Sequence, residues 1–278
     1  MGNFRTQVGI AAILASIGAS SVKGADIYNE SPPDAALVPN ERVVSAFVAA
    51  GAGFAPEYEG SDKYKVVPFA FANLKWQGVE LQLRGLQARI DALGDSAWDI
   101  GPVVKYRGKR DDDVDGPVRR LDEIDAAVEV GGFIGYKFGG DETGQGEIGL
   151  EASLLRDVAD AHDGFVAIAQ LSYAALKWGP LYANVDAQTT YASKEFNRTY
   201  FGVTQSGSVA SGLRAYRPGA GFKDVSAGLT VGYQINERWG VLGRASVTRY
   251  VGDAADSPIV KDGSETAGLF GLAVSYRY

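Results

Sequence analysis

The sequence predicts an all-β protein: a transmembrane antiparallel up-and-down β-barrel of about 12 strands, with about 10 as the second choice, preceded by a signal peptide. Three observations predict this fold. Apolar residues recur at every second position over long segments, short turns alternate with long polar connections, and aromatic residues gather at the segment ends. Strands of soluble proteins average about five or six residues. These segments are long enough for a tilted strand that crosses a membrane, which needs about 9–11 residues.

The first residues have the pattern of a secretory signal peptide. Arg5 precedes an apolar run from Val8 to Ala19, and small residues then lead to a cleavage site after Gly24. The run is shorter than the roughly 20 residues that a transmembrane helix needs. We therefore predict a signal peptide over residues 1–24, in preference to a buried N-terminal helix. A flexible periplasmic lead-in is predicted over 25–41 and the outer membrane barrel over 42–278.

The strands follow in order from the period-two alternation. In residues 223–235, Val225 and Leu229 lie on one face and Ser226 and Thr230 on the other. The pattern changes phase after Gly85, so residues 78–90 form either one kinked strand or two. A bacterial barrel of this kind has an even number of strands, which favours two. The predicted segments are 42–53, 65–75, 78–90, 97–107, 124–138, 146–156, 164–177, 180–192, 223–235, 238–250 and 266–278.

The polar faces of these strands distinguish a membrane barrel from a soluble one. In residues 124–138, Ile124, Val130 and Tyr136 share the apolar face, and Glu129 and Lys137 lie opposite. A soluble lipocalin-like barrel would bury the charged face as a dry core, which is too costly, and a soluble sandwich has shorter strands. The positive and negative side chains predicted to face the lumen are similar in number. This balance favours ion pairs that close the lumen rather than an open pore. The residues predicted to face the lumen include Glu80, Gln82, Arg84, Asp99, Lys105, Arg107, Glu129, Glu151, Asp186 and Arg244.

The connections and the aromatic residues also favour a membrane barrel. Short turns, such as "KWGP" and "INER", contrast with long polar segments at 108–123, 193–222 and 251–265. Outer membrane barrels have short periplasmic turns, long extracellular loops and two girdles of aromatic residues. The predicted girdle residues are Trp98, Tyr106, Tyr136, Phe138, Trp178, Tyr191, Tyr233, Trp239, Tyr276 and Tyr278.

The composition excludes several classes of function. The chain has no cysteine, one histidine and a net charge of −7, with a pI of about 4.9. No disulfide framework can form, and an acidic chain without a basic stripe argues against a nucleic-acid partner. "GAGFKD", which ends at Asp224, predicts a tight turn into a strand and not a phosphate loop, because no helix follows. No cofactor is predicted.

The single histidine, His162, lies among Asp157, Asp160 and Asp163. A histidine that an aspartate orients can act as a general base. The sequence identifies no further partner for such a site, so a histidine in an acidic loop is the preferred interpretation. We therefore do not expect an enzyme.

An acidic loop offers one metal hypothesis. Asp111, Asp113, Asp115 and Gly116 fit the start of a calcium loop, with Asp122 at its twelfth position. The usual glutamate is missing there, strands and not helices flank the loop, and the neighbouring arginines can neutralise the acids. A solvated acidic loop is the alternative. The metal ligands would be Asp111, Asp113, Asp115 and Asp122.

The last predicted strand alternates up to its final residue. Leu272, Val274, Tyr276 and Tyr278 would face lipid. Such a strand resembles the signal that the outer membrane assembly machinery reads. We therefore predict that these four residues form an assembly signal and that this machinery and outer membrane lipid are partners.

Several segments carry a resemblance to a known family. "GAGFAPEYEGSDKYKVVPF", "LDEIDAAVEVGGFIGYKFG", "YFGVTQSGSVASGLRAYRPGAGFKDV" and "VGDAADSPIV" are similar to the MipA/OmpV family of outer membrane proteins, over about residues 43–278. The resemblance implies an outer membrane barrel. In one branch of the family it also implies a scaffold that bridges a lytic transglycosylase and a penicillin-binding protein. Other branches are described as adhesins or porin-like proteins, and the family has no agreed catalytic residues.

A scaffold linked to murein enzymes is therefore the first functional hypothesis. A narrow channel for small solutes or a surface adhesin is the alternative.

Overall fold

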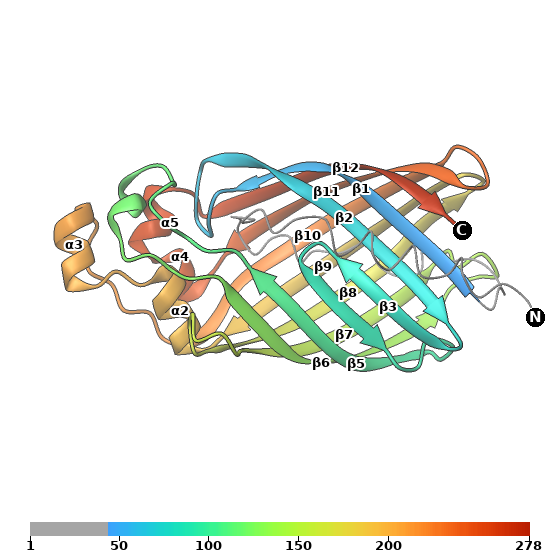
Figure 1. The fold of residues 1–278 in the computed structure, drawn as a ribbon, viewed down its shortest axis with the longest axis horizontal. Coiled ribbons are helices and arrows are strands. Elements are labelled where there is room, and N and C mark those ends of the chain that lie inside the picture. Colours follow the sequence, from blue (N-terminus) through green and yellow to red (C-terminus); the bar gives the residue numbers. More distant parts are fainter. Residues whose placement is uncertain (1–43) are drawn as a thin grey trace, which may run out of the picture.

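Twelve strands form one closed antiparallel barrel in the computed structural model, which describes residues 44–278 (Figure 1). The predicted signal peptide, residues 1–24, and the lead-in, residues 25–41, lie outside the described residues and stay predictions. Each strand pairs with its neighbours along the chain, and the first pairs with the last. The strands are β1 (Val44–Pro56), β2 (Tyr64–Trp76), β3 (Val79–Arg84), β4 (Gln87–Asp91), β5 (Trp98–Arg107), β6 (Ala127–Gly139), β7 (Glu147–Asp157), β8 (Phe165–Trp178), β9 (Leu181–Ala192), β10 (Gly221–Gln234), β11 (Trp239–Tyr250) and β12 (Thr266–Arg277).

A two-residue turn explains the strand number. Segment 78–90 is two strands, because Gly85 adopts a φ of 56° and turns the chain back between β3 and β4. The prediction of twelve strands is confirmed, and the second choice of ten is wrong. The barrel closes where Phe47 of β1 lies opposite Arg277 of β12 and Phe54 opposite Phe270.

The outer surface of the barrel is apolar, and many polar side chains face inward. On β10, Val225 and Leu229 are 49% and 43% exposed, whereas Ser226 and Thr230 are 4% and 0% exposed. A continuous exposed apolar band of this kind is stable in lipid and not in water. The predicted membrane barrel is confirmed.

Aromatic side chains meet near both ends of the strands. Trp98 contacts Tyr136, with ring centroids 4.7 Å apart, and Trp239 contacts Tyr276 at 4.9 Å. Near the opposite end, Tyr191 contacts Phe222 at 5.5 Å. These rings occupy the positions that the predicted interfacial girdles require.

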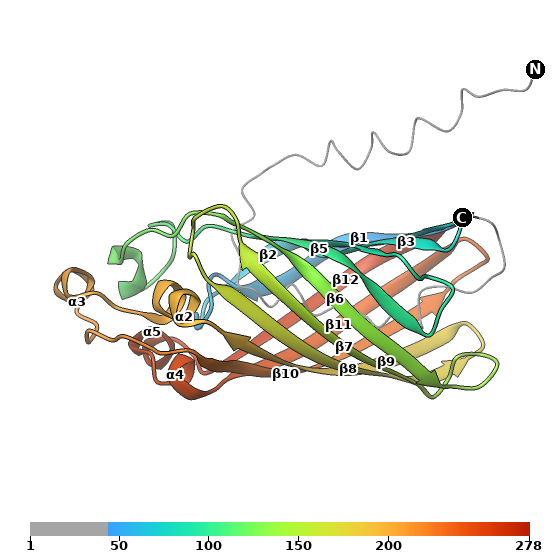
Figure 2. The same cartoon turned by 90° about the horizontal axis from the view of Figure 1, so that it is seen from below.

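The two ends of the barrel differ. One end, called here the turn end, carries the short turns, such as Gly179–Pro180, and Tyr278. The other, the loop end, carries the long segments, and Figure 2 shows the short helices gathered there. They are η3 (Pro117–Arg120), α2 (Lys194–Phe201), α3 (Gln205–Ser211), α4 (Gly252–Ala255) and α5 (Pro258–Asp262). Within the described residues, no helix has the length and apolar character to cross a membrane.

One assignment from the sequence is wrong. Ile124 was expected on the outer face of a strand, but β6 begins at Ala127 and Ile124 is buried. Ile124 instead forms an isolated bridge with Arg110, in the connection between the end of β5 and the start of β6.

A charge on the lipid face should destabilise this barrel. Leu229 lies near the middle of β10 and faces outward, so Leu229→Arg is expected to lower the free energy of unfolding by about 2–4 kcal/mol. Urea unfolding of the barrel in lipid vesicles measures the change, with Leu229→Ala as the control for lost apolar area. Equal losses in both variants would mean that this face is not in lipid.

Candidate functional site

A cluster of buried charges lies inside the loop end of the barrel. We call Glu59, Arg107, Glu129, Lys223 and Asp224 the ion cluster; each is less than a tenth exposed. Arg107, the last residue of β5, donates from Nη1 to Glu59 Oε1 at 2.9 Å and from Nη2 to Glu129 Oε1 at 2.9 Å. The guanidinium of Arg107 thus joins strand β6 to the loop that connects β1 and β2.

Lys223 connects the same cluster to the opposite part of the wall. Its Nζ donates to Glu59 Oε2 at 3.2 Å and also to the carboxylate of Asp224. Buried charges are costly to remove from water, and charge-assisted hydrogen bonds offset this cost when the geometry is good. Because Glu59 binds both Arg107 and Lys223, side chains from β5 and β10 meet across the lumen.

A β-bulge places Lys223 in this cluster. The period-two pattern puts Lys223 on the same outward face as Val225, but the register between β9 and β10 shifts between Phe222 and Asp224. The extra residue turns Lys223 and Asp224 both inward. Nothing in the alternation of this segment predicts the bulge, so sequence reasoning missed Lys223; it also did not name Asp224, which shares the inward face with Ser226, or Glu59 in its loop.

His162 belongs to the wall of the ion cluster. Its Nε2 lies 3.1 Å from Glu129 Oε1, and its Nδ1 accepts a hydrogen bond from Gly164 N at 3.1 Å. An Nδ1 that accepts implies that Nε2 carries the proton and donates it to Glu129. The side chain is buried, and Asp157 binds its backbone nitrogen at 2.7 Å. Of the predicted group, Asp157 and His162 are brought together, whereas Asp160 and Asp163 are exposed.

Helix α2, called here the lid helix, covers the ion cluster. Ser193 caps it by accepting a hydrogen bond from Phe196 N, as a serine at this position is expected to do. The ring of Phe196 lies 5.0 Å from that of His162, and the guanidinium of Arg107 lies 4.7 Å from the centre of Phe196 and 5.0 Å from that of Tyr200. A cation over an aromatic face is attracted to the ring. The lid helix is therefore attached to the charges that fill the lumen.

A second apolar cluster lies above the lid helix. The loops contribute side chains that pack together outside the barrel, so the loop end has a small core of its own. Ser257 Oγ also donates to the carbonyl of Phe201 at 2.7 Å, which joins α5 to the lid helix. This cap consists of Tyr58, Val114, Val118, Val203 and Ile259, with Leu121, Leu213 and Tyr216 packed against it.

Burial at the loop end shifts the pKa values of two side chains, Tyr58 and Arg110. It raises the pKa of Tyr58 to about 12, because the phenolate would lose its hydration, and the neighbouring Arg110 offsets only part of this effect. Burial also lowers the pKa of Arg110 to about 10. Arg110 donates to the carbonyl of Tyr200 at 3.2 Å, which adds a contact between this loop and the lid helix.

The raised pKa of Tyr58 should make the protein less stable at high pH. An unfolded tyrosine ionises near its ordinary pKa of 10.0, whereas the folded phenol stays protonated to about 12. Between these values the unfolded state has fewer protons, so the free energy of unfolding falls as pH rises. Tyr58→Phe is expected to remove this part of the pH dependence, measured by unfolding at pH 9 to 12. An identical slope in both proteins would contradict the assignment.

Further ion pairs lie in the rest of the lumen. Arg244 binds both oxygens of Asp186 at 2.9 and 3.0 Å, and Arg89 Nη1 donates to Glu151 at 2.6 Å while stacking on Phe133. On the β1–β2 side, the lumen is filled by apolar side chains instead. Phe69 packs so closely on Gly271 that a Cβ there would lie 2.7 Å from its ring. The prediction that inward charges form ion pairs is confirmed, and their closure of the lumen stays a prediction.

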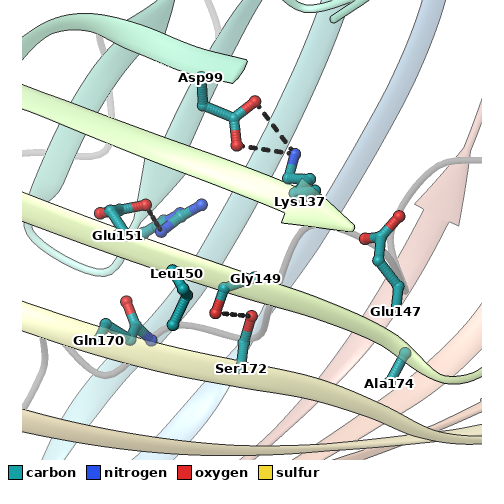
Figure 3. A pocket seen from close by; sticks show the side chains of 10 residues that line it. Asp99, Lys137, Glu147, Gly149, Leu150, Glu151, Gln170, Ser172 and Ala174 are labelled. Atoms are coloured by element: carbon teal, nitrogen blue, oxygen red, sulfur yellow. Dashed lines mark hydrogen bonds and ion pairs between the residues drawn. The ribbon is translucent and has the colours of Figure 1, made fainter. Parts of the chain in front are cut away.

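A small polar cavity remains in the half of the lumen nearer the turn end (Figure 3). Lys137 binds Asp99 at 3.0 Å on one side, and Ser172 donates to the carbonyl of Gly149 at 3.5 Å on the other. The cavity has a volume of about 30 Å³, which is room for one or two water molecules. Its lining also includes Arg84, Glu147, Glu151 and Gln170.

The predicted calcium ligands are distributed over several contacts. Asp111 Oδ2 binds Lys109 Nζ at 2.7 Å, the backbone of Asp115 donates to Glu57, and Asp122 accepts from Thr204 at 3.4 Å. Asp113 is exposed and donates its backbone N–H to Asp111. In the part of the chain that the structure describes, no group of three or more histidine, cysteine, aspartate or glutamate residues is placed to hold a metal ion. Calcium binding stays a prediction, tested by calorimetric titration with Asp113→Ala as the control.

The predicted assembly residues line the outer face of β12. Leu272, Val274 and Tyr278 are exposed, and Tyr276 packs on Trp239. Tyr278 N donates to the carbonyl of Ala46 at 2.8 Å, so it contributes to the closure of β12 on β1. Their role as an assembly signal stays a prediction.

Comparison with known proteins identifies related sequences. The sequence profile of the family described as "MltA-interacting protein MipA" matches residues 48–278. The outer membrane protein OmpV of Vibrio cholerae is 34% identical over 92 residues, which cover 33% of this chain and 34% of OmpV. The MltA-interacting protein of Escherichia coli is 30% identical over 129 residues, 46% of this chain and 50% of that protein. The chain thus spans between a third and a half of the length of these curated relatives.

Two solved structures resemble the outline of this chain at low sequence identity. An outer membrane channel from Pseudomonas putida F1 has a TM-score of 0.47 at 9% identity, covering 90% of this chain and 100% of the channel. The translocator domain of the autotransporter NalP from Neisseria meningitidis has a TM-score of 0.42 at 11% identity, covering 87% of this chain and 91% of that domain.

Proposed function

Because this chain belongs to the MltA-interacting protein MipA family and is an outer membrane β-barrel, we propose that it serves as a scaffold that binds murein enzymes at its turn end. In outer membrane barrels the short turns face the periplasm, where murein lies. The partners proposed are a lytic transglycosylase and a penicillin-binding protein. The relative from Escherichia coli has a name that states an interaction with MltA.

The buried ion pairs that cross the lumen are the observation that carries this proposal. A barrel that transports solutes by diffusion needs a continuous water-filled path. Here Arg107, Glu59 and Lys223 meet across the lumen, and the lid helix covers them. A barrel filled in this way offers rigid surfaces, and a rigid surface loses little entropy when it binds a partner.

Co-purification from crosslinked cell envelopes tests the scaffold. The exposed Glu142 lies in the turn between β6 and β7 at the turn end, and the exposed Asp112 lies at the loop end. We expect wild-type barrel to recover a murein enzyme, Glu142→Lys to recover less, and the matched charge reversal Asp112→Lys to recover as much as wild type. If no murein enzyme accompanies the wild-type barrel, the scaffold proposal fails.

A narrow channel for small solutes is the second candidate. The polar cavity between Lys137, Asp99 and Ser172 favours it, because it leaves part of the lumen accessible to water (Figure 3). Recording of the purified barrel in planar bilayers separates the two functions. Steady single-channel steps would favour the channel, and the absence of steps would favour the scaffold.

A further inference from the structure

The barrel wall has a break between β2 and β5 at the loop end. The ladder between β1 and β2 runs from Tyr64 to Trp76, but the ladder between β2 and β3 covers only Phe71–Trp76. The last backbone bond on that side runs from Gly85 N to the carbonyl of Ala70 at 3.0 Å. Figure 1 shows the hairpin of β3 and β4 turning back before the loop end that β2 reaches.

Pro68 lies on the free edge of β2. Successive residues of a strand direct their backbone groups to alternate neighbours. Since the carbonyl of Ala70 points to β3, the backbone groups of Pro68 and Val66 point the same way, where the described chain provides no strand partner. Proline has no N–H to leave unpaired, which is why it occurs at strand edges. The sequence is therefore adapted to an open edge at this position.

The break lies at the height of the apolar band. Val66 is opposite Phe54 in β1, and Phe54 is opposite Phe270 in β12. All three face outward, with exposed fractions of 66%, 53% and 49%. Lipid cannot satisfy free backbone groups, so an incomplete ladder at this height costs stability. Because the incomplete ladder does not stabilise the fold, a functional role is the better explanation for it.

Hydrocarbon lines the inner side of the break as well. Val67, Phe69 and Phe71 of β2 face the lumen, each at most 5% exposed, and Leu269 of β12 is buried beside them. Buried charged side chains line the neighbouring strands, including Arg84 of β3, Arg89 of β4 and Arg107 of β5. An apolar molecule that entered through the break would contact the apolar side chains of β2.

Side chains hold the break closed. Arg107, at the end of β5, binds Glu59 in the loop between β1 and β2, at 2.9 Å. The backbone N–H of Asp115, beyond β5, donates to Glu57 in the same loop at 3.1 Å. These side-chain contacts join the two sides of the break, where the described residues form no ladder between β2 and β5.

We propose that the break between β2 and β5 is a lateral portal from the membrane to the apolar side of the lumen. It admits the hydrocarbon chain of a single-chain amphiphile, and the ion pair between Arg107 and Glu59 holds it shut. The occupant is a hydrocarbon chain because hydrocarbon lies outside the break and apolar side chains lie inside it.

Thiol labelling tests the portal, since the chain has no cysteine of its own. Val67→Cys places one thiol behind the break, and Val166→Cys places one equally buried thiol on β8, which is paired on both sides. Each variant is combined with wild-type Glu59 or with Glu59→Gln and reconstituted in phosphatidylethanolamine–phosphatidylglycerol vesicles. The probes are an alkyl-chain maleimide dissolved in the bilayer and a charged maleimide in the water.

We expect Glu59→Gln to accelerate alkyl-maleimide labelling of Val67→Cys about tenfold, the factor for one lost hydrogen bond between charged groups. Labelling of Val166→Cys and labelling by the charged probe should not change. Equal acceleration at both cysteines, acceleration by the charged probe, or no acceleration would overturn the portal. Heat-modifiable gel mobility confirms folding first, and Arg107→Lys replaces Glu59→Gln if that variant does not fold.

Discussion

Arg107→Ala is expected to lower the free energy of unfolding by about 3–5 kcal/mol, because it leaves two buried carboxylates, Glu59 and Glu129, without their shared partner. Removal of one member of a buried pair costs more than the pair contributed, because each remaining carboxylate stays buried with one counter-ion fewer. The guanidinium also stacks on Phe196 and Tyr200, so the lid helix loses contacts too. Urea unfolding in lipid vesicles, followed by tryptophan fluorescence, measures the loss.

Arg249 provides the matched control for this experiment. It is paired with Glu265, but its side chain is 59% exposed to solvent. Exposed ion pairs contribute about 0–1 kcal/mol, so Arg249→Ala should be close to wild type. If both variants lost the same stability, burial of the ion cluster would not be the cause.

Phe196→Ala is expected to destabilise the barrel by about 3–5 kcal/mol, the usual cost of deleting a buried phenyl ring. Phe196 is 0% exposed and lies between His162, Arg107 and Tyr200. Its removal leaves a cavity between the lid helix and the ion cluster. The lid helix should then become accessible to protease while the strands stay protected.

Val209→Ala is the control for the lid. Val209 lies on α3 and is 89% exposed, so its truncation should change stability by less than about 0.5 kcal/mol. Cleavage sites mapped by mass spectrometry should lie within residues 193–220 for Phe196→Ala only. Protection of this segment in Phe196→Ala would show that the ring does not hold the lid helix in place.

The strands could be predicted almost to the residue. Segment 180–192 is β9 over Leu181–Ala192, and segment 238–250 is β11 over Trp239–Tyr250. The reason is local. Successive residues of a barrel strand face lipid and lumen in turn, so apolar and polar residues alternate along the sequence. The short helices could have been anticipated only in part, from Ser193, Thr204 and the pair Ser257–Pro258 at their N-caps.

The candidate site could be predicted only as a set of inward charges. Glu129 and Arg107 were placed in the lumen correctly, but their partners were not identifiable. Glu59 and Lys223 are separated by 164 residues, and their contact depends on how the loop between β1 and β2 folds over the barrel. The bulge before Asp224 also reverses the direction of Lys223, against the period of its own strand.

The sequence alone therefore determined the barrel, its strand phases and its polar interior, because these follow from the alternation of neighbouring residues. The tertiary structure alone decided that Arg107, Glu59 and Lys223 meet across the lumen, that the lid helix covers them, and that the described wall is incomplete beside Pro68. These features depend on the register between strands and on contacts between loops. Both are set by the packing of segments that lie far apart in the chain.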